Sequence, residues 1–351
     1  MEIRNVAIIA HVDHGKTTLV DQLLRDAGVL RRNEQDVERI MDTGDLERER
    51  GITILSKNTA VVYGDTRINI VDTPGHADFG GEVERILQMV DGVLLLIDAF
   101  EGCMPQTRFV LRKALELDKV PVVVVNKIDR PDARPAEVLD EALELFIELG
   151  ASAEQLDFPV VYASGRDGKA GLSPEALQNN MAPLFDTILS AIPAPRDAGD
   201  EPLQVLFSAI DYDEYLGRIG IGRVERGIAV KGAPVVICGG EQGRQLETKI
   251  TRLYHFEGLK RVEIETAACG DIVCVAGVEG LNVGETACDP QHIEPLPFVK
   301  IDEPTVAMLF MVNDSPFAGR EGKYVTSRNL RERLFNEVKT NVSMRVEETG
   351  S

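Results

Sequence analysis

The sequence predicts an α/β, doubly wound domain with a mostly parallel sheet, then an all-β barrel, and then the start of an α+β domain of ferredoxin-like type. Three observations support this order. Apolar strand runs alternate with helical patterns in the first half of the chain, which is typical of doubly wound folds. After a proline-rich stretch, short β-branched segments recur with glycine at the turns, as in a small barrel. The last residues hold a strand-like run followed by one apolar helical face.

The first domain is expected over residues 1–195. Its runs 92–97 and 120–125 are short and rich in Val, Leu and Ile, which is typical of parallel strands buried on both faces. Residues 192–202 are rich in proline and polar side chains and predict a linker. The predicted strands of this domain cover residues 6–9, 59–63, 68–71, 93–97, 122–125 and 160–162.

The barrel is expected over residues 203–300, and the start of the third domain over residues 303–351. In the third domain a strand is predicted at 305–312. Because a strand and one helix leave no room for the rest of a domain, we expect the chain to stop inside its third domain. The apolar face of the predicted helix is made by Leu330, Leu334, Phe335 and Val338.

Composition restricts the class of protein. The 351 residues suit two or three domains, and no apolar run approaches the roughly 18 residues that span a bilayer. The chain enters a strand directly after Met1, which leaves no room for a signal peptide. Five scattered cysteines without C-x-x-C spacing are expected to be reduced, buried thiols rather than metal ligands. We therefore expect a cytoplasmic monomer without a membrane partner.

Charge is uneven along the chain. The formal net charge of −20 argues against a broad electrostatic grip on nucleic acid. Residues 318–346, however, hold seven Lys or Arg and three Glu. This segment is either an RNA-facing strip or a solvated helix face, and its charge does not distinguish the two.

A candidate phosphate loop lies between a predicted strand and a predicted helix, the context that the motif needs. It reads Ala-His-Val-Asp-His-Gly-Lys-Thr over residues 10–17, with Ala10 where the strict pattern has glycine. Backbone N–H groups of such a loop wrap phosphates, and the helix N-terminus adds a favourable field. Lys16 is expected to reach the β and γ oxygens, and the Thr17 hydroxyl to bind Mg²⁺. The nucleotide-binding residues predicted here are Asp13, His14, Gly15, Lys16, Thr17 and Thr18.

Two further segments are expected to respond to the γ-phosphate. Asp72 ends a predicted strand and is placed to hold Mg²⁺ through a water molecule, while the Gly75 N–H can approach the γ-phosphate. Thr53 follows a polar, charged stretch and is expected to supply a second protein oxygen to Mg²⁺. As an alternative, the same stretch describes an ordinary charged surface loop.

His76 is the candidate catalytic residue together with Lys16. It follows Gly75 directly, where Ras-type GTPases carry a glutamine, and we expect it to orient the attacking water. Phosphoryl transfer depends on positioning and charge stabilisation more than on a strong base. Since no arginine finger is evident in this chain, we expect slow turnover that a partner accelerates.

Base recognition is assigned to the run Asn-Lys-Ile-Asp at 126–129, which follows a predicted buried strand. The Asp129 carboxylate can accept hydrogen bonds from guanine N1–H and the exocyclic amine. Adenine would leave that charge unpaired, which is costly. Ser164 and the Gly165 N–H are expected to close the site near guanine O6, and Asn126 and Lys127 complete the predicted set.

With these motifs the chain resembles translational GTPases, and closely the BipA/TypA family. The general resemblance lies in HVDHGKTT, ERERGITI, VDTPGHADF, NKID and the domain order. The specific resemblance lies in DFGGEVER, MPQTRF, LDFPVVYAS, DEPT and GKYVTSR. Elongation factor G is similar, but it carries a large insertion between its N-K-x-D motif and its guanine-closing serine. Here Asn126 and Ser164 are only 38 residues apart, so that insertion is absent.

The resemblance implies a GTPase that binds the ribosome and hydrolyses GTP to GDP and phosphate. It implies roles in large ribosomal subunit assembly and stress-responsive translation, and binding of guanosine tetraphosphate at the GTP site. Contacts with rRNA, ribosomal proteins and A-site tRNA would come mainly from domains beyond this sequence. The resemblance also implies that Val12 and Ile52 form an apolar gate beside His76.

Two other functions remain open from the sequence. The protein could be a binding module that senses guanine nucleotide or guanosine tetraphosphate, with incidental hydrolysis. It could also be a translocase, against which the absent insertion argues.

Overall fold

The computed structural model describes residues 1–29, 57–73, 80–240, 243–297, 306–313, 315–317, 320, 324, 326–341 and 344–349. The predictions for Ile52, Thr53, Gly75 and His76 therefore lie outside the described residues.

The first domain is built on a seven-stranded sheet in the order β2-β3-β1-β4-β5-β6-β7. The pairs among β3, β1, β4, β5 and β6 are parallel, whereas the two edge strands β2 and β7 pair antiparallel. All six predicted strands lie inside observed strands, and the doubly wound, mostly parallel sheet is confirmed. The strands are β1 (Glu2–Ala10), β2 (Lys57–Tyr63), β3 (Thr66–Asp72), β4 (Gly92–Asp98), β5 (Val120–Asn126), β6 (Val160–Ser164) and β7 (Lys169–Gly171).

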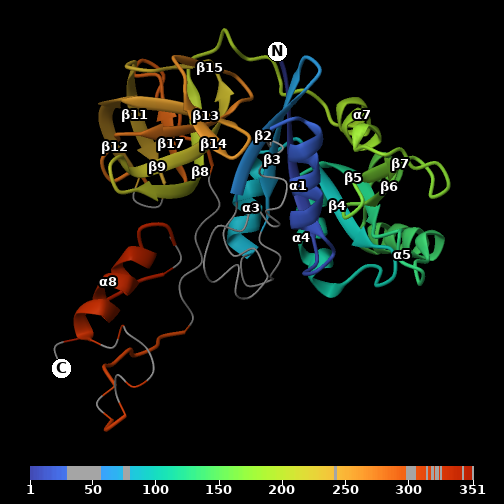
Figure 1. The fold of residues 1–351 in the computed structure, drawn as a ribbon. Coiled ribbons are helices and arrows are strands. Elements are labelled where there is room, and N and C mark those ends of the chain that lie inside the picture. The colour runs from blue at the N-terminus through green and yellow to red at the C-terminus, as the bar shows by residue number, and fades with distance from the viewer. Residues whose placement is uncertain are drawn as a thin grey trace.

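Helices cover both faces of this sheet, which explains the continuous apolar runs. In β4, Leu94 and Leu96 pack with helices α1 and α7, whereas Val93 and Leu95 pack with α3, α4 and α5 on the opposite face. Figure 1 shows these helices around the sheet. Every side chain of such a strand is buried, so polar alternation is lost. The helices are α1 (Lys16–Asp26), α3 (Gly80–Gln88), α4 (Pro105–Glu116), α5 (Pro135–Glu148), α6 (Ala153–Leu156) and α7 (Ala182–Ala191).

The second domain is a curled, antiparallel β structure, as predicted. Its eight-stranded sheet has the order β12-β11-β17-β8-β9-β16-β13-β14, and a two-stranded sheet joins β10 to β15. Register shifts in the β8–β9 pair bend these long strands, as bulges do in barrels. The strands are β8 (Gln204–Asp213), β9 (Gly217–Arg226), β10 (Ile228–Val230), β11 (Pro234–Gly239), β12 (Arg244–Lys249), β13 (Arg252–Glu257), β14 (Lys260–Glu263), β15 (Thr266–Ala268), β16 (Ile272–Ala276) and β17 (Glu285–Cys288).

The barrel packs against the first domain through apolar and polar contacts. Arg67 Nη1 on β3 lies 3.1 Å from Asp271 Oδ2 and 2.6 Å from His255 Nδ1, both in the barrel. Asn5 Nδ2 on β1 donates to the Gly270 carbonyl at 2.8 Å. Several barrel side chains share one core cluster with α3 and α4, namely Ile219, Ile221, Phe256, Ile272, Cys274 and Ala276.

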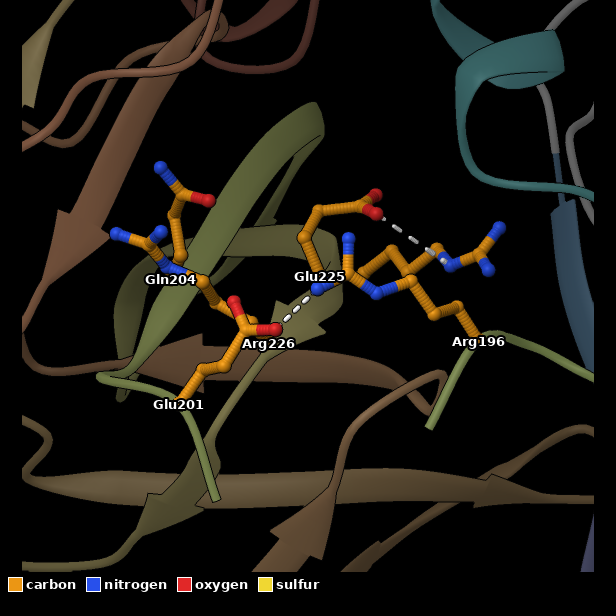
Figure 2. A pocket seen from close by; sticks show the side chains of 6 residues that line it. Arg196, Glu201, Gln204, Glu225 and Arg226 are labelled. Carbon is orange, nitrogen blue, oxygen red and sulfur yellow. Dashed lines mark hydrogen bonds and ion pairs between the residues drawn. The ribbon is translucent and has the colours of Figure 1, made fainter. Parts of the chain in front are cut away.

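A cavity of about 250 Å³ lies between the linker and the barrel (Figure 2). Within its lining, Arg196 pairs with Glu201, and Arg223 Nε lies 3.8 Å from Glu225 Oε2. Arg226 pairs with Glu294, which lies outside the lining. Arg223 pairs with Asp91 at 2.8 Å, just before β4 begins. The cavity thus faces the amino ends of the parallel strands, whereas the predicted nucleotide loops follow their carboxyl ends. Its lining residues are Arg196, Glu201, Gln204, Arg223, Glu225 and Arg226.

The predicted strand at 305–312 is wrong over its described residues. Residues 306–313 form no strand, and Val306 and Met311 are 75% and 74% exposed. A strand needs a neighbour to satisfy its backbone groups, and none of the described strands pairs with this segment. The predicted helix forms as α8 (Ser327–Glu337), and the Thr326 side chain accepts from the Asn329 N–H at its start. Because α8 buries no residue, the α+β domain stays a prediction.

Among the described residues, no helix is long and apolar enough to cross a membrane. The five cysteines are free thiols, and Cys238, Cys274 and Cys288 are buried whereas Cys103 and Cys269 are partly exposed. Burial raises the pKa of Cys103 to about 12, and the nearby Glu141 carboxylate contributes. In the part of the chain that the structure describes, no group of three or more His, Cys, Asp or Glu side chains could hold a metal ion.

Candidate nucleotide-binding site

The candidate phosphate loop connects β1, which ends at Ala10, to α1, which begins at Lys16. Asp13 has a φ of 66° and Gly15 a φ of 92°, so the loop turns sharply through left-handed backbone. A Cβ at Gly15 would lie 2.6 Å from Asn126 Nδ2. This close approach, as well as the positive φ, favours glycine at the start of α1. Thr17 and Thr18 occupy the first turn of α1.

His14 fastens the loop to the sheet. Its side chain is fully buried, and Nδ1 lies 3.3 Å from both the Leu96 carbonyl oxygen and the Asp98 backbone nitrogen. Burial lowers the pKa of His14 by more than the hydrogen bond to the Leu96 carbonyl raises it. The ring is therefore neutral at pH 7. The side chain is thus an anchor in the core, and the predicted nucleotide contact of His14, which stays a prediction, would have to come from its backbone.

Lys16 and Asp72 come together at the carboxyl ends of β1 and β3. Lys16 Nζ lies 2.8 Å from Asp72 Oδ1 and also donates to the Thr73 carbonyl. Both side chains are buried, with exposed fractions of 8% for Lys16 and 1% for Asp72. Two motifs separated by more than fifty residues therefore meet, while the phosphate and Mg²⁺ roles of these residues stay predictions.

Asn126 joins the phosphate loop to the loop after β6. Its Nδ2 donates to the His14 carbonyl at 2.9 Å, and its Oδ1 accepts from the Gly165 N–H at 3.0 Å. The side chain is buried, at 2% exposure. Since the Gly165 N–H already has this partner, its predicted contact with guanine O6 stays a prediction. Ser164 is also buried, and its Oγ accepts from the Asp167 N–H at 3.3 Å.

Lys127 makes a second link between the two loops. Its Nζ donates to the Asp13 carbonyl at 2.5 Å and lies 2.8 Å from Asp98 Oδ2. Lys127 has a φ of 62°, an unusual conformation for a residue with a side chain. Asp129, two residues on, is exposed and therefore accessible to a ligand.

Sequence reasoning missed Asp98. This residue closes the apolar run of β4, and its side chain is fully buried. A carboxylate at the carboxyl end of a buried parallel strand, next to the strand that carries Asn126, was a signal that could have identified it. Of the predicted gate only Val12 is described, and it is half-buried.

Two family models match the chain over these domains. A model described as the elongation factor Tu GTP binding domain matches residues 1–194, and one described as elongation factor Tu domain 2 matches residues 217–288. The fold and the loops thus define a GTP-binding domain of the elongation factor Tu type followed by the second domain of the same factors.

Solved structures share this architecture. A crystal structure of a protein from Thermus thermophilus has a TM-score of 0.72 at 21% identity and covers 99% of this chain and 62% of that chain. A bacterial selenocysteine-specific elongation factor has a TM-score of 0.63 at 21% identity and covers 83% of this chain and 45% of that chain. At this identity the likeness concerns the fold alone.

Two relatives carry the name large ribosomal subunit assembly factor BipA. The Bacillus subtilis (strain 168) protein is 62% identical over 350 residues, which are 100% of this chain and 57% of that protein. The Haemophilus influenzae protein is 55% identical over 349 residues, which are 99% of this chain and 56% of that protein. The chain belongs to the BipA/TypA family of translational GTPases. It spans a little over half the length of these relatives.

Proposed function

We propose that this chain binds GTP and GDP and hydrolyses GTP. The observation that carries the proposal is the direct bonding of the two nucleotide loops. Asn126 Nδ2 holds the His14 carbonyl at 2.9 Å, and Lys127 Nζ holds the Asp13 carbonyl. A base bound at Asp129 and phosphates bound at the loop before α1 are then recognised by one connected unit. Such preorganisation lowers the cost of binding.

Hydrolysis is assigned to His76 and Lys16. Lys16 neutralises developing charge on the β and γ oxygens, and His76 orients the attacking water. The Gly75 N–H contributes a hydrogen bond to the γ-phosphate, and Val12 and Ile52 limit the access of His76 to that water. These roles follow from the sequence and from the family, since residues 30–56 and 74–79 lie outside the described part of the chain.

Mg²⁺ is the proposed cofactor. The Thr17 hydroxyl and the Asp72 carboxylate are hard oxygen donors of the kind that Mg²⁺ prefers. Asp72 lies beside Lys16 at the phosphate loop, which fits an ion shared between protein and phosphate. Thr17 and Thr53 would bind the ion directly, and Asp72 through water. The bound ion would supply charge neutralisation to the phosphate oxygens.

The whole protein is proposed to act on the ribosome in the cytoplasm. The name of the relatives, large ribosomal subunit assembly factor, supports this partner and this step. Stress-responsive translation control and binding of guanosine tetraphosphate at the GTP site belong to the same proposal. Contacts with rRNA and A-site tRNA are assigned mainly to the part of the relatives that this chain does not span.

Titration calorimetry tests the nucleotide site. The chain is titrated with GDP, a non-hydrolysable GTP analogue, guanosine tetraphosphate and ATP, each with Mg²⁺. Binding of the guanine ligands without binding of ATP is expected. Binding of ATP with equal affinity would overturn the base assignment, and binding of no nucleotide would overturn the site.

A second experiment separates the enzyme from a binding module. Phosphate release by full-length protein is measured in multiple turnover, with and without ribosomes. Ribosome-stimulated turnover supports the GTPase. Stoichiometric nucleotide binding without turnover under both conditions supports a module that only senses nucleotide.

A further inference from the structure

A buried carboxylate lies beneath the base-recognition loop, outside the motifs that define the site. Asp98 is the last residue of β4 and pairs in register with Asn126 at the end of β5. The side chain is 0% exposed. An isolated buried charge is costly, so the contacts that keep this carboxylate in place indicate its role.

Asp98 contacts two cations of the loop after β5. Its Oδ2 lies 2.8 Å from Lys127 Nζ and 3.6 Å from Arg130 Nη1. Lys127 and Arg130 flank Asp129 in the sequence, so Asp98 forms ion pairs with residues on both sides of the base-recognition residue. Arg130 also stacks over the Phe100 ring, with its Cζ 5.2 Å from the ring centroid.

The other carboxylate oxygen fixes the start of the following turn. Asp98 Oδ1 accepts from the Phe100 N–H at 2.7 Å and from the Glu101 N–H at 3.2 Å. Burial by itself would raise the pKa of Asp98, but the Lys127 ammonium and these two N–H groups together hold it below its usual value. The carboxylate is therefore ionised at pH 7 and can hold Lys127 as an ion pair.

Lys127 connects the buried Asp98 carboxylate to the phosphate loop. The same Nζ that meets Asp98 donates to the Asp13 carbonyl, and both Lys127 and Asp13 have positive φ. Two residues in a costly backbone conformation are thus held by one ammonium group between them. Without its buried counter-charge, that ammonium would gain from turning toward water.

We propose that Asp98 is a positioning residue for guanine recognition: it anchors Lys127 and thereby presents Asp129 to the base. This inference rests on the proposed function, since it concerns the same nucleotide. The alternative is that Asp98 only stabilises the turn at Phe100 and Glu101. That role would affect folding but would not distinguish one purine base from another.

The test compares GDP with inosine diphosphate, which lacks the exocyclic amine. Asp129 makes one hydrogen bond fewer to inosine, so a displaced Asp129 costs GDP more than inosine diphosphate. Asp98→Asn keeps the shape and one acceptor for the turn but removes the charge. We expect GDP affinity to fall by about 10- to 100-fold, by analogy with residues that orient the ligands of a metal ion. The preference for GDP over inosine diphosphate is expected to fall as well.

Two further variants make the result specific. Asp132→Asn removes a carboxylate that pairs with Arg130 at the surface, and it is expected to leave both affinities within about twofold because exposed pairs contribute little. Lys127→Met alone and combined with Asp98→Asn completes a double-mutant cycle. If Asp98 acts through Lys127, the double variant binds GDP no more weakly than Lys127→Met. If Asp98→Asn does not fold, Asp98→Ser replaces it, since its hydroxyl can still accept the Phe100 N–H.

The outcomes separate this inference from the proposed function. Equal losses for GDP and inosine diphosphate, or losses that add fully in the double variant, would show that Asp98 has only a structural role. Unchanged affinity in Asp98→Asn would also overturn the inference while leaving the nucleotide site intact. Failure of the wild-type chain to bind GDP would instead count against the proposed function.

Discussion

Removal of the Asp271 carboxylate is expected to destabilise the protein strongly. Asp271 and Arg67 are 5% and 8% exposed, and their ion pair joins the barrel to β3 at 3.1 Å. In Asp271→Ala, the Arg67 guanidinium keeps His255 as a neighbour but loses its counter-charge. Breaking a buried pair from one side costs about 3–5 kcal/mol. That is a large part of the roughly 5–15 kcal/mol that stabilises a typical protein.

Urea unfolding at 25 °C, followed by far-UV circular dichroism because the chain has no tryptophan, measures this loss. We expect a lower midpoint and a broadened or divided transition, since the weakened interface lets the two domains unfold separately. Glu263→Ala is the matched control, because Glu263 pairs with Arg252 on the barrel surface and exposed pairs contribute little. A loss of less than about 1 kcal/mol in Asp271→Ala would refute the reasoning that this pair is buried and coupled.

Three substitutions test the nucleotide site. Lys16→Ala is expected to weaken GTP and GDP binding at least about 100-fold, because it removes the cation that binds the phosphates and that pairs with the buried Asp72 carboxylate. Near-normal affinity in calorimetry would exclude Lys16 from the phosphate site. His76→Ala is expected to keep GTP affinity and to reduce turnover about 100-fold or more, measured as phosphate release with ribosomes. A parallel loss of affinity and turnover would contradict a role in orienting water. Asp129→Asn is expected to shift preference from guanine to xanthine nucleotides in competition binding, since an amide can donate to the xanthine oxygen, and unchanged selectivity would disprove the base assignment.

The short motifs were predictable because each depends on local chemistry. The phosphate loop needs glycine for the left-handed turn at Gly15, whose φ is 92°, and it needs a lysine and a hydroxyl at the start of a helix. The strand runs of the first domain were predictable because burial on both faces makes them uniformly apolar. The sequence could not show that Lys16 meets Asp72, but the order of strands in a doubly wound sheet made that meeting expected.

The strand predicted at 305–312 shows where such reasoning stops. Its apolar, β-branched composition is suited to a sheet, but strand structure requires hydrogen-bonding neighbours that composition does not supply. The described segment 306–313 has none, and its apolar side chains are exposed. Helix α8 forms nevertheless, because its backbone hydrogen bonds are all local.

The sequence by itself determined the class of the fold, the order of the first two domains and the positions of the phosphate and base motifs, since these follow from periodicity and from residue types in short runs. Only the tertiary structure decided which distant residues act together. Asp98 reaches Lys127, and Arg67 reaches Asp271, because β4 and β5 are neighbours and the barrel packs on β3. The contribution of a buried charge to the free energy of folding depends on its partners. Partners far apart in the chain come together only when the sheet and the domain interface have formed.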